Sequence, residues 1–383
     1  MINYFKKQLN INSLLLNAIY ILNISLPMLI FAFFFLSKKY DESVDYMLVV
    51  SLSLFLTFSL SGNFRQTLIA DNNIALCESV LIKRIFISLI IFFLSFFISF
   101  YILNITNFSI IFIGTLIPTI IWLNEINLIL IEIKKDFKNL IFKFFFNYFS
   151  LFLLFLSFFY LQNKFLPIFI IFYTLLFYIQ NFNFKLLGNF HYIKEIKFTF
   201  KVNYISSISL NLSSFLFKYE INYFLDKKNA ALLFFCITVG SSLSTITFNS
   251  MGPKDFINSI KLSFQFILLL IVYATACIVT YFLVAKGIMF QDYTNNAAYI
   301  LTISIIGGLI FTYSYILRQN IISKDQYRTQ GFMLDVLYSV ILIITVPLLF
   351  WIDKDYLAFS YFITSLCSFL IYYYYYKFIV KKL

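Results

Sequence analysis

Long apolar runs dominate this chain and recur along its whole length. About a dozen of them reach roughly 20 residues, which is the length at which a helix crosses the hydrocarbon core of a bilayer. Of the 383 residues, 61% are hydrophobic and only 12% are charged, whereas a soluble domain carries about 25% charged residues. Because a soluble core could not absorb this composition, the sequence predicts an all-α, polytopic integral membrane protein.

The apolar runs predict twelve transmembrane helices in two sets of six. The expected spans are 14–36, 46–62, 85–104, 108–131, 141–161, 165–182, 204–225, 230–250, 262–285, 297–317, 331–351 and 356–376. The long connection 183–203 separates the two sets and is interpreted as a linker on the cytoplasmic side. We therefore expect a bundle of six helices over 1–182 and a second over 204–383, an arrangement typical of transporters built from repeats.

Basic residues are distributed unevenly between the two sides of the predicted membrane. Of the 29 lysines and arginines, 21 fall in one set of connections with the two termini, seven fall in the opposite set, and Lys218 lies in a span. By the positive-inside rule, both termini are cytoplasmic. The net charge of +12 is then a signal of topology and of contact with anionic lipids, and does not indicate a nucleic-acid partner.

Residues for enzyme chemistry are scarce. The single histidine, His191, lies in the linker, so a histidine-based metal site or catalytic triad is not expected. The four cysteines are scattered singly, which does not suggest a metal cluster. The longest external connections, 37–45 and 286–296, are too short for a catalytic domain, and no glycine-rich phosphate loop is present. The sequence predicts neither an enzyme nor a cofactor, leaving a transporter, a channel or a scaffold.

Polar residues inside the spans are the best indicators of function, because a charge at the bilayer centre costs about 2.5 to 3.5 kcal/mol and must face protein or water. The span 204–225 carries two polar faces. One face, expected to line a wet cavity, holds Ser207, Asn211, Ser214, Lys218 and Asn222, and the nearly opposite face holds Ser206, Ser209, Ser213 and Glu220. Lys218 either attracts an anionic cargo or extends to the membrane interface, and the spacing favours neither.

Two further spans carry polar residues at helical spacing. In 230–250, Thr245 and Asn249 share a face beside the small residue Gly240, a pattern that also permits close helix packing. In 108–131, Asn124 and Asn127 share a face, and the neighbouring Glu125 is either a proton or cation relay or a structural partner of a basic residue. Pro27, Pro118 and Pro347 interrupt three spans, where bends are expected. Asp335, near the cytoplasmic end of its span, is interpreted as an interface residue.

Three segments resemble the polysaccharide-exporter and O-antigen flippase branch of the multidrug/oligosaccharidyl-lipid/polysaccharide superfamily, whose members have a MATE-like fold. SLSGNFRQTLIADNN at 59–73 resembles that family's exit from the second span. INYFLDKKNAALLFFCITVGSSLSTITFN at 221–249 resembles its seventh-to-eighth hairpin, although the glycine often found after the aspartate is absent. ILRQNIISKDQYRTQGFMLDVLYSVILIITVPLLF at 316–350 resembles its tenth-to-eleventh connection.

This resemblance implies a flippase that moves a polyprenyl-linked oligosaccharide across the bacterial inner membrane, such as a capsule repeat unit or the O-antigen repeat unit of lipopolysaccharide biosynthesis. It implies that Lys218 and Arg65 attract the anionic head of the cargo, and that the polar faces bind sugar hydroxyls. Glu125 or Glu220 would couple an ion gradient. Membrane lipids and the glycan polymerase and ligase machinery are the implied partners.

Three alternatives stay open. A drug or small-solute antiporter of the same superfamily would share the fold but would prefer an acidic residue for cationic cargo. A major-facilitator transporter also has twelve spans, yet its usual Gly-x-x-x-Asp-Arg pattern is absent after the second span. A glycan polymerase is disfavoured by the short external connections.

Overall fold

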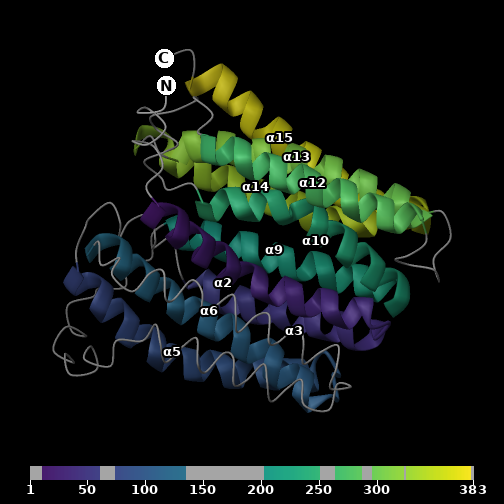
Figure 1. Ribbon diagram of the computed structural model, residues 1–383, viewed down its shortest axis with the longest axis horizontal. Helices are drawn as coiled ribbons and strands as arrows, with labels where there is room; N and C mark the ends of the chain where they lie inside the picture. The colour runs from purple at the N-terminus through teal and green to yellow at the C-terminus, as the bar shows by residue number, and fades with distance from the viewer. Residues whose placement is uncertain are drawn as a thin grey trace. The chain divides into compact units, whose positions relative to one another are not determined.

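The computed structural model describes residues 11–60, 74–134, 202–250, 264–286, 296–322 and 325–380. These residues form helices joined by short connections, and none of them is in a strand (Figure 1). The predicted spans 141–161 and 165–182 lie outside the described residues, as do the first 19 residues of the predicted linker.

Four of the described helices come from the first half of the chain. They are α2 (Ile11–Leu36), α3 (Tyr40–Ser59), α5 (Ile74–Tyr101) and α6 (Phe108–Lys134). The prediction of an external connection over 37–45 is wrong, because α3 already begins at Tyr40. Asp41 and Glu42 lie in its first turn, where carboxylates interact favourably with the amino end of the helix dipole.

In the described residues of the second half there are six longer helices and three short ones. They are α9 (Val202–Phe224), α10 (Lys227–Ser250), α12 (Phe264–Ala285), α13 (Asn296–Ile322), η3 (Asp325–Tyr327), α14 (Arg328–Ile352), η4 (Lys354–Phe359), α15 (Ser360–Tyr375) and η5 (Tyr376–Val380). Pro347 lies inside α14, as Pro27 and Pro118 lie inside α2 and α6.

Six segments in the described part of the chain are long and apolar enough to cross a membrane. They are Tyr40–Ser59, Lys83–Tyr101, Phe108–Ile126, Ala297–Ile322, Arg328–Ile352 and Lys354–Phe378. Several large apolar side chains are exposed along these segments, for example Ile90 and Phe93 in α5 and Trp351 in α14. Lipid would cover such side chains, so the prediction of a polytopic, helical membrane protein is confirmed for the described residues.

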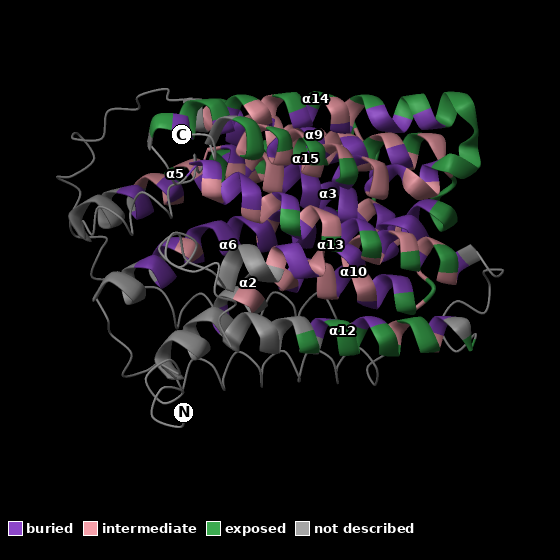
Figure 2. Ribbon diagram, turned by 90° about the horizontal axis from the view of Figure 1, so that it is seen from above, coloured by how far each residue is buried: buried purple, intermediate pink, exposed green. Residues whose placement is uncertain are grey.

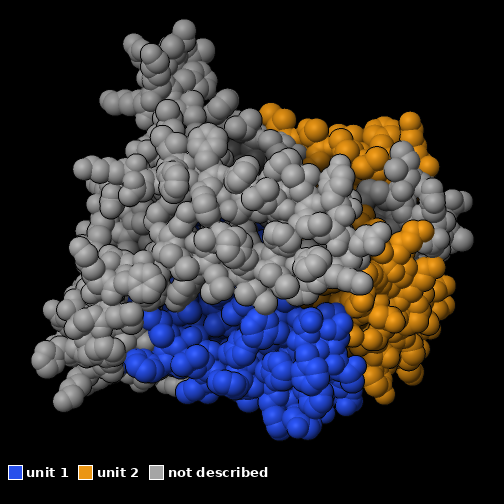
Figure 3. Space-filling view, turned by 60° about the horizontal axis from the view of Figure 1, so that its bottom comes forward, with its two compact units in different colours: residues 1–29, 52–200 blue, residues 30–51, 201–383 orange. Residues whose placement is uncertain are grey.

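The chain divides into two compact units. Unit 1 comprises residues 1–29 and 52–200, and unit 2 comprises residues 30–51 and 201–383 (Figure 3). In unit 1, α5 packs against α6, and the short connection between them makes the two helices antiparallel neighbours. Ser53 of α3 and Ser95 of α5 share a buried hydrogen bond of 2.6 Å in the same unit.

In unit 2, α9 packs against α14, α10 against α13, and α13 against α15. Helices α10 and α13 cross at very close range, because a Cβ atom on Gly308 would lie 1.8 Å from the carbonyl oxygen of Gly240. The prediction that Gly240 permits close helix packing is thus confirmed. Helix α12, in contrast, carries a run of exposed residues along one side (Figure 2).

Candidate functional site

The candidate site is built on α9, the helix with two polar faces. Lys218 projects from one face, and its Nζ donates a hydrogen bond of 2.8 Å to Oγ of Ser51 in α3. Ser51 is buried, and its hydroxyl donates in turn to the main-chain oxygen of Met47 at 2.7 Å. In the part of the chain that the structure describes, no carboxylate forms an ion pair with Lys218. The ammonium is therefore held by a neutral oxygen.

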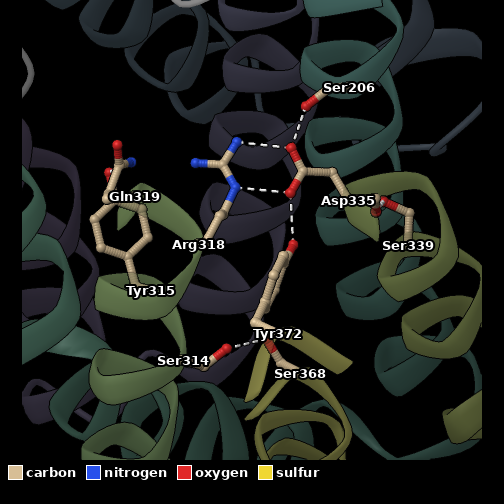
Figure 4. Close-up of polar contacts among 9 residues, drawn as sticks. All are labelled: Ser206, Ser314, Tyr315, Arg318, Gln319, Asp335, Ser339, Ser368 and Tyr372. Atoms are coloured by element: carbon tan, nitrogen blue, oxygen red, sulfur yellow. Dashed lines mark hydrogen bonds and ion pairs between the residues drawn. The ribbon is translucent and has the colours of Figure 1, made fainter. Parts of the chain in front are cut away.

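The other face of α9 contacts a buried ion pair (Figure 4). Arg318 of α13 donates to both carboxylate oxygens of Asp335 in α14, with 2.7 Å from Nε to Oδ1 and 2.7 Å from Nη2 to Oδ2. The hydroxyl of Ser206 in α9 donates to Oδ2, and that of Tyr372 in α15 donates to Oδ1 at 2.5 Å. One carboxylate thus joins α9, α13, α14 and α15.

Asp335 was interpreted from the sequence as an interface residue, and that interpretation is wrong. Its side chain has no exposed surface, and Arg318 pairs with it through two parallel hydrogen bonds. The sequence offered one signal for this pair. Arg318 lies within the apolar pattern of α13, which continues to Ile322, so its guanidinium required a partner inside the protein.

Unit 1 contains a second arginine and carboxylate pair, in which the arginine is buried and the carboxylate is half-buried. Arg84 of α5 donates from Nη1 to Oε2 of Glu125 in α6 at 2.8 Å and to the main-chain oxygen of Trp122 at 2.6 Å. The guanidinium also lies over the indole ring of Trp122, 4.7 Å from its centroid. Of the two roles predicted for Glu125, this geometry favours the structural partner of a basic residue.

The remaining predicted residues of α9 and α10 lie where a helical face would place them. Asn211 donates to the main-chain oxygen of Ser207 at 2.7 Å, and Ser214 is exposed. Thr245 donates to the main-chain oxygen of Ser241 at 3.1 Å. These hydrogen bonds stay within their own helices.

The structure describes only part of the remaining predicted set. Asn124 is fully buried in α6. Asn127 and Asn249 belong to α6 and α10, but their side chains lie outside the described set, and Arg65 lies outside the described residues altogether. The contact that the sequence did not predict is the hydrogen bond between Lys218 and Ser51.

Glu220 lies on the face of α9 opposite Lys218. Its Oε2 is buried and has no hydrogen-bond partner among the described residues, and the same holds for Oδ1 of Asn222. Burying a carboxylate oxygen without a partner is costly. Glu220 is thus a candidate on α9 for proton or cation binding. No group of three or more potential metal ligands occurs among the described residues.

No protein-family model matches this chain, and no curated protein matches it. Among solved structures, the chain aligns with a multidrug resistance MATE family transporter of the MOP superfamily in an outward-facing conformation. The TM-score is 0.49 at 10% sequence identity, and the alignment covers 97% of this chain and 98% of that chain. A similarity of this size assigns neither a family nor a cargo.

Proposed function

We propose that this protein is a flippase of the bacterial inner membrane with both termini in the cytoplasm. Its cargo is a polyprenyl-linked oligosaccharide, such as an O-antigen or capsule repeat unit, and it works by alternating access. The cargo carries an anionic pyrophosphate head and a chain of sugar hydroxyls, while its lipid tail can stay in the bilayer. Such a cargo requires a cation and hydrogen-bonding side chains on membrane helices.

The single observation that carries this proposal is the hydrogen bond of Lys218 to a neutral partner. Among the residues that the structure describes, its ammonium is held only by the hydroxyl of Ser51, a neutral partner that a phosphate oxygen could replace. A lysine that served structure alone would be expected to pair with a carboxylate, as Arg84 and Arg318 do. Lys218 therefore supplies a positive charge that an anionic head can use.

Neighbouring side chains supply the hydrogen bonds for sugars. Ser207, Asn211 and Ser214 lie on the same face of α9 as Lys218. The side chain of Asn211 keeps its Oδ1 for a further partner while Nδ2 is bonded within the helix. Prolines within α2, α6 and α14 permit the helix bending that alternating access requires.

A drug or small-solute antiporter is the second candidate function, and one observation favours it. The buried Oε2 of Glu220, which has no hydrogen-bond partner in the described part of the chain, is a place where a proton or a cationic solute could bind. Glu125, the other acid predicted for this role, is already paired with Arg84. In the flippase, Glu220 would couple cargo movement to an ion gradient.

Lys218→Ala tests the proposal directly. Loss of a charge-assisted hydrogen bond to the cargo should lower export of lipid-linked oligosaccharide at least about tenfold, while membrane insertion is unchanged. Lys218→Arg should retain part of the export. Lys228→Ala, at the exposed start of α10, is the matched control and should export normally. Normal export by Lys218→Ala would remove the lysine, and with it the proposal's main support.

A further inference from the structure

Helix α9 is fixed against α14 at both ends. Near its amino end, Ser206 donates to Asp335, and near its carboxyl end the ring of Phe224 stacks on that of Phe350 with centroids 4.3 Å apart. The order of these contacts shows that α9 and α14 run in the same direction. The face of α9 that carries Ser206 is therefore turned toward α14.

Lys218 leaves α9 in a different direction. It lies twelve residues after Ser206, which corresponds to about 120° of rotation around a helix of 3.6 residues per turn. In that direction the ammonium reaches Ser51 of α3. If α9 turned about its axis, the Ser206 contact and the Lys218 contact would be lost together.

The partner of Ser206 is itself held on several sides. Two hydrogen bonds from Arg318 and one from Tyr372 fix the carboxylate of Asp335, and Ser339 donates to the main-chain oxygen of Asp335 at 2.8 Å. Asp335 is thus a fixed point within unit 2. A single hydroxyl links α9 to it.

We propose that the contact between Ser206 and Asp335 sets the rotation of α9 and thereby directs Lys218 toward Ser51. Ser206 and Asp335 are positioning residues, since neither contacts the cargo-facing ammonium. The importance of this geometry for transport rests on the proposed function of Lys218. The geometry itself can be tested without any cargo.

The test is the reactivity of Lys218 in the intact protein. Purified protein in lipid nanodiscs is treated briefly with an amine-reactive acetylating reagent, and the modification of Lys218 relative to Lys227 and Lys228 is read by peptide mass spectrometry. In Ser206→Ala, α9 is released from Asp335, and the relative labelling of Lys218 should rise by about threefold to tenfold. Ser51→Ala should give a similar rise by removing the acceptor directly.

Two further variants serve as controls for the labelling test. Ser213 is buried on the same face as Ser206, but its hydroxyl donates within α9 to the main-chain oxygen of Leu210 at 3.0 Å. Ser213→Ala therefore removes an equal hydroxyl and should leave Lys218 labelling unchanged. Ser206→Cys keeps the size of the side chain and a weak donor, so its labelling should be intermediate.

Unchanged Lys218 labelling in Ser206→Ala, at a melting temperature close to that of the wild type, would overturn this inference. So would an equal rise in Ser213→Ala, because the effect would then follow from any lost hydroxyl. Normal export by Lys218→Ala would overturn the proposed function instead, and the labelling would still decide whether Ser206 orients the helix.

Discussion

Arg318 and Asp335 face each other inside unit 2 with both carboxylate oxygens bound, at 2.7 Å from Nε and 2.7 Å from Nη2 (Figure 4). The pair joins α13 to α14, and Ser206 and Tyr372 add α9 and α15. In apolar surroundings such a pair is compensated only while it is complete. Unit 2 therefore depends on both partners for its stability.

Removing one partner of this pair should be far more damaging than removing both. Arg318→Ala leaves a fully buried carboxylate without its cation, and we expect a loss of about 3 to 5 kcal/mol. The double variant Arg318→Met with Asp335→Leu should recover much of that loss. Thermal unfolding in detergent measures both, with the exposed Gln330→Ala as control. An Arg318→Ala protein as stable as the wild type would contradict this account.

The close crossing of α10 and α13 should tolerate no added side chain at Gly308. A Cβ atom there would meet the backbone of Gly240 at 1.8 Å, and backbone cannot move aside as a side chain can. Gly308→Ala should therefore lower the melting temperature clearly. Gly331→Ala is the control, because the nearest atoms to its Cβ belong to side chains, those of Ile322 at 2.8 Å and Ile321 at 3.2 Å. Equal effects of the two variants would show that the crossing is not as tight as described.

Arg84 and Glu125 should stabilise unit 1 as a coupled pair. The single variants Arg84→Ala and Glu125→Ala each remove one side of this ion pair, so their effects on unfolding should be strongly non-additive. The double-mutant cycle should give a coupling energy of about 0.5 to 3 kcal/mol. If Glu125 instead served only as a proton relay, its replacement would alter the pH dependence of transport and the cycle would show no coupling.

The turn between α9 and α10 should show a pH effect through Asp226. Burial alone would raise the pKa of this carboxyl, but hydrogen bonds from the side chain and main chain of Asn229, together with the nearby charge of Lys354, hold the pKa below its ordinary value of 3.8. A lowered pKa means that the ionised form stabilises the fold. This contribution is complete above the unfolded pKa of about 3.9 and is lost as the pH falls through the folded value.

Asp226→Ala should therefore be less stable than the wild type near neutral pH, and the difference should shrink as the pH falls below about 4. Unfolding curves measured across that range provide the check. A difference that grows on acidification would show that the sign of the effect is reversed.

The helices could be predicted well from the sequence because lipid imposes length and apolarity on each span. Every predicted span in the described residues overlaps a helix. The second polar face of α9 was also identified from the sequence, and Ser206 on that face has a polar partner in Asp335. Periodicity along one helix reveals which direction a side chain takes.

Partners between helices could not be predicted in the same way. Arg84 and Glu125 are 41 residues apart, and Lys218 and Ser51 are 167 residues apart. No spacing rule connects such positions, because the contact depends on which helices pack together. Arg318 lies just beyond the predicted span 297–317, and only the packing of α13 on α14 shows that Asp335 holds it inside the protein.

The most direct test of the central claim is where the lipid-linked oligosaccharide accumulates when the protein is absent. The gene is deleted in its host, and lipid-linked oligosaccharides on each leaflet of the inner membrane are measured by mass spectrometry after leaflet-selective labelling. We predict that complete repeat units accumulate on the cytoplasmic leaflet while surface glycan is lost, and that the wild-type protein, but not Lys218→Ala, restores export. Normal export, accompanied by altered drug sensitivity or solute uptake, would contradict the flippase and favour the antiporter.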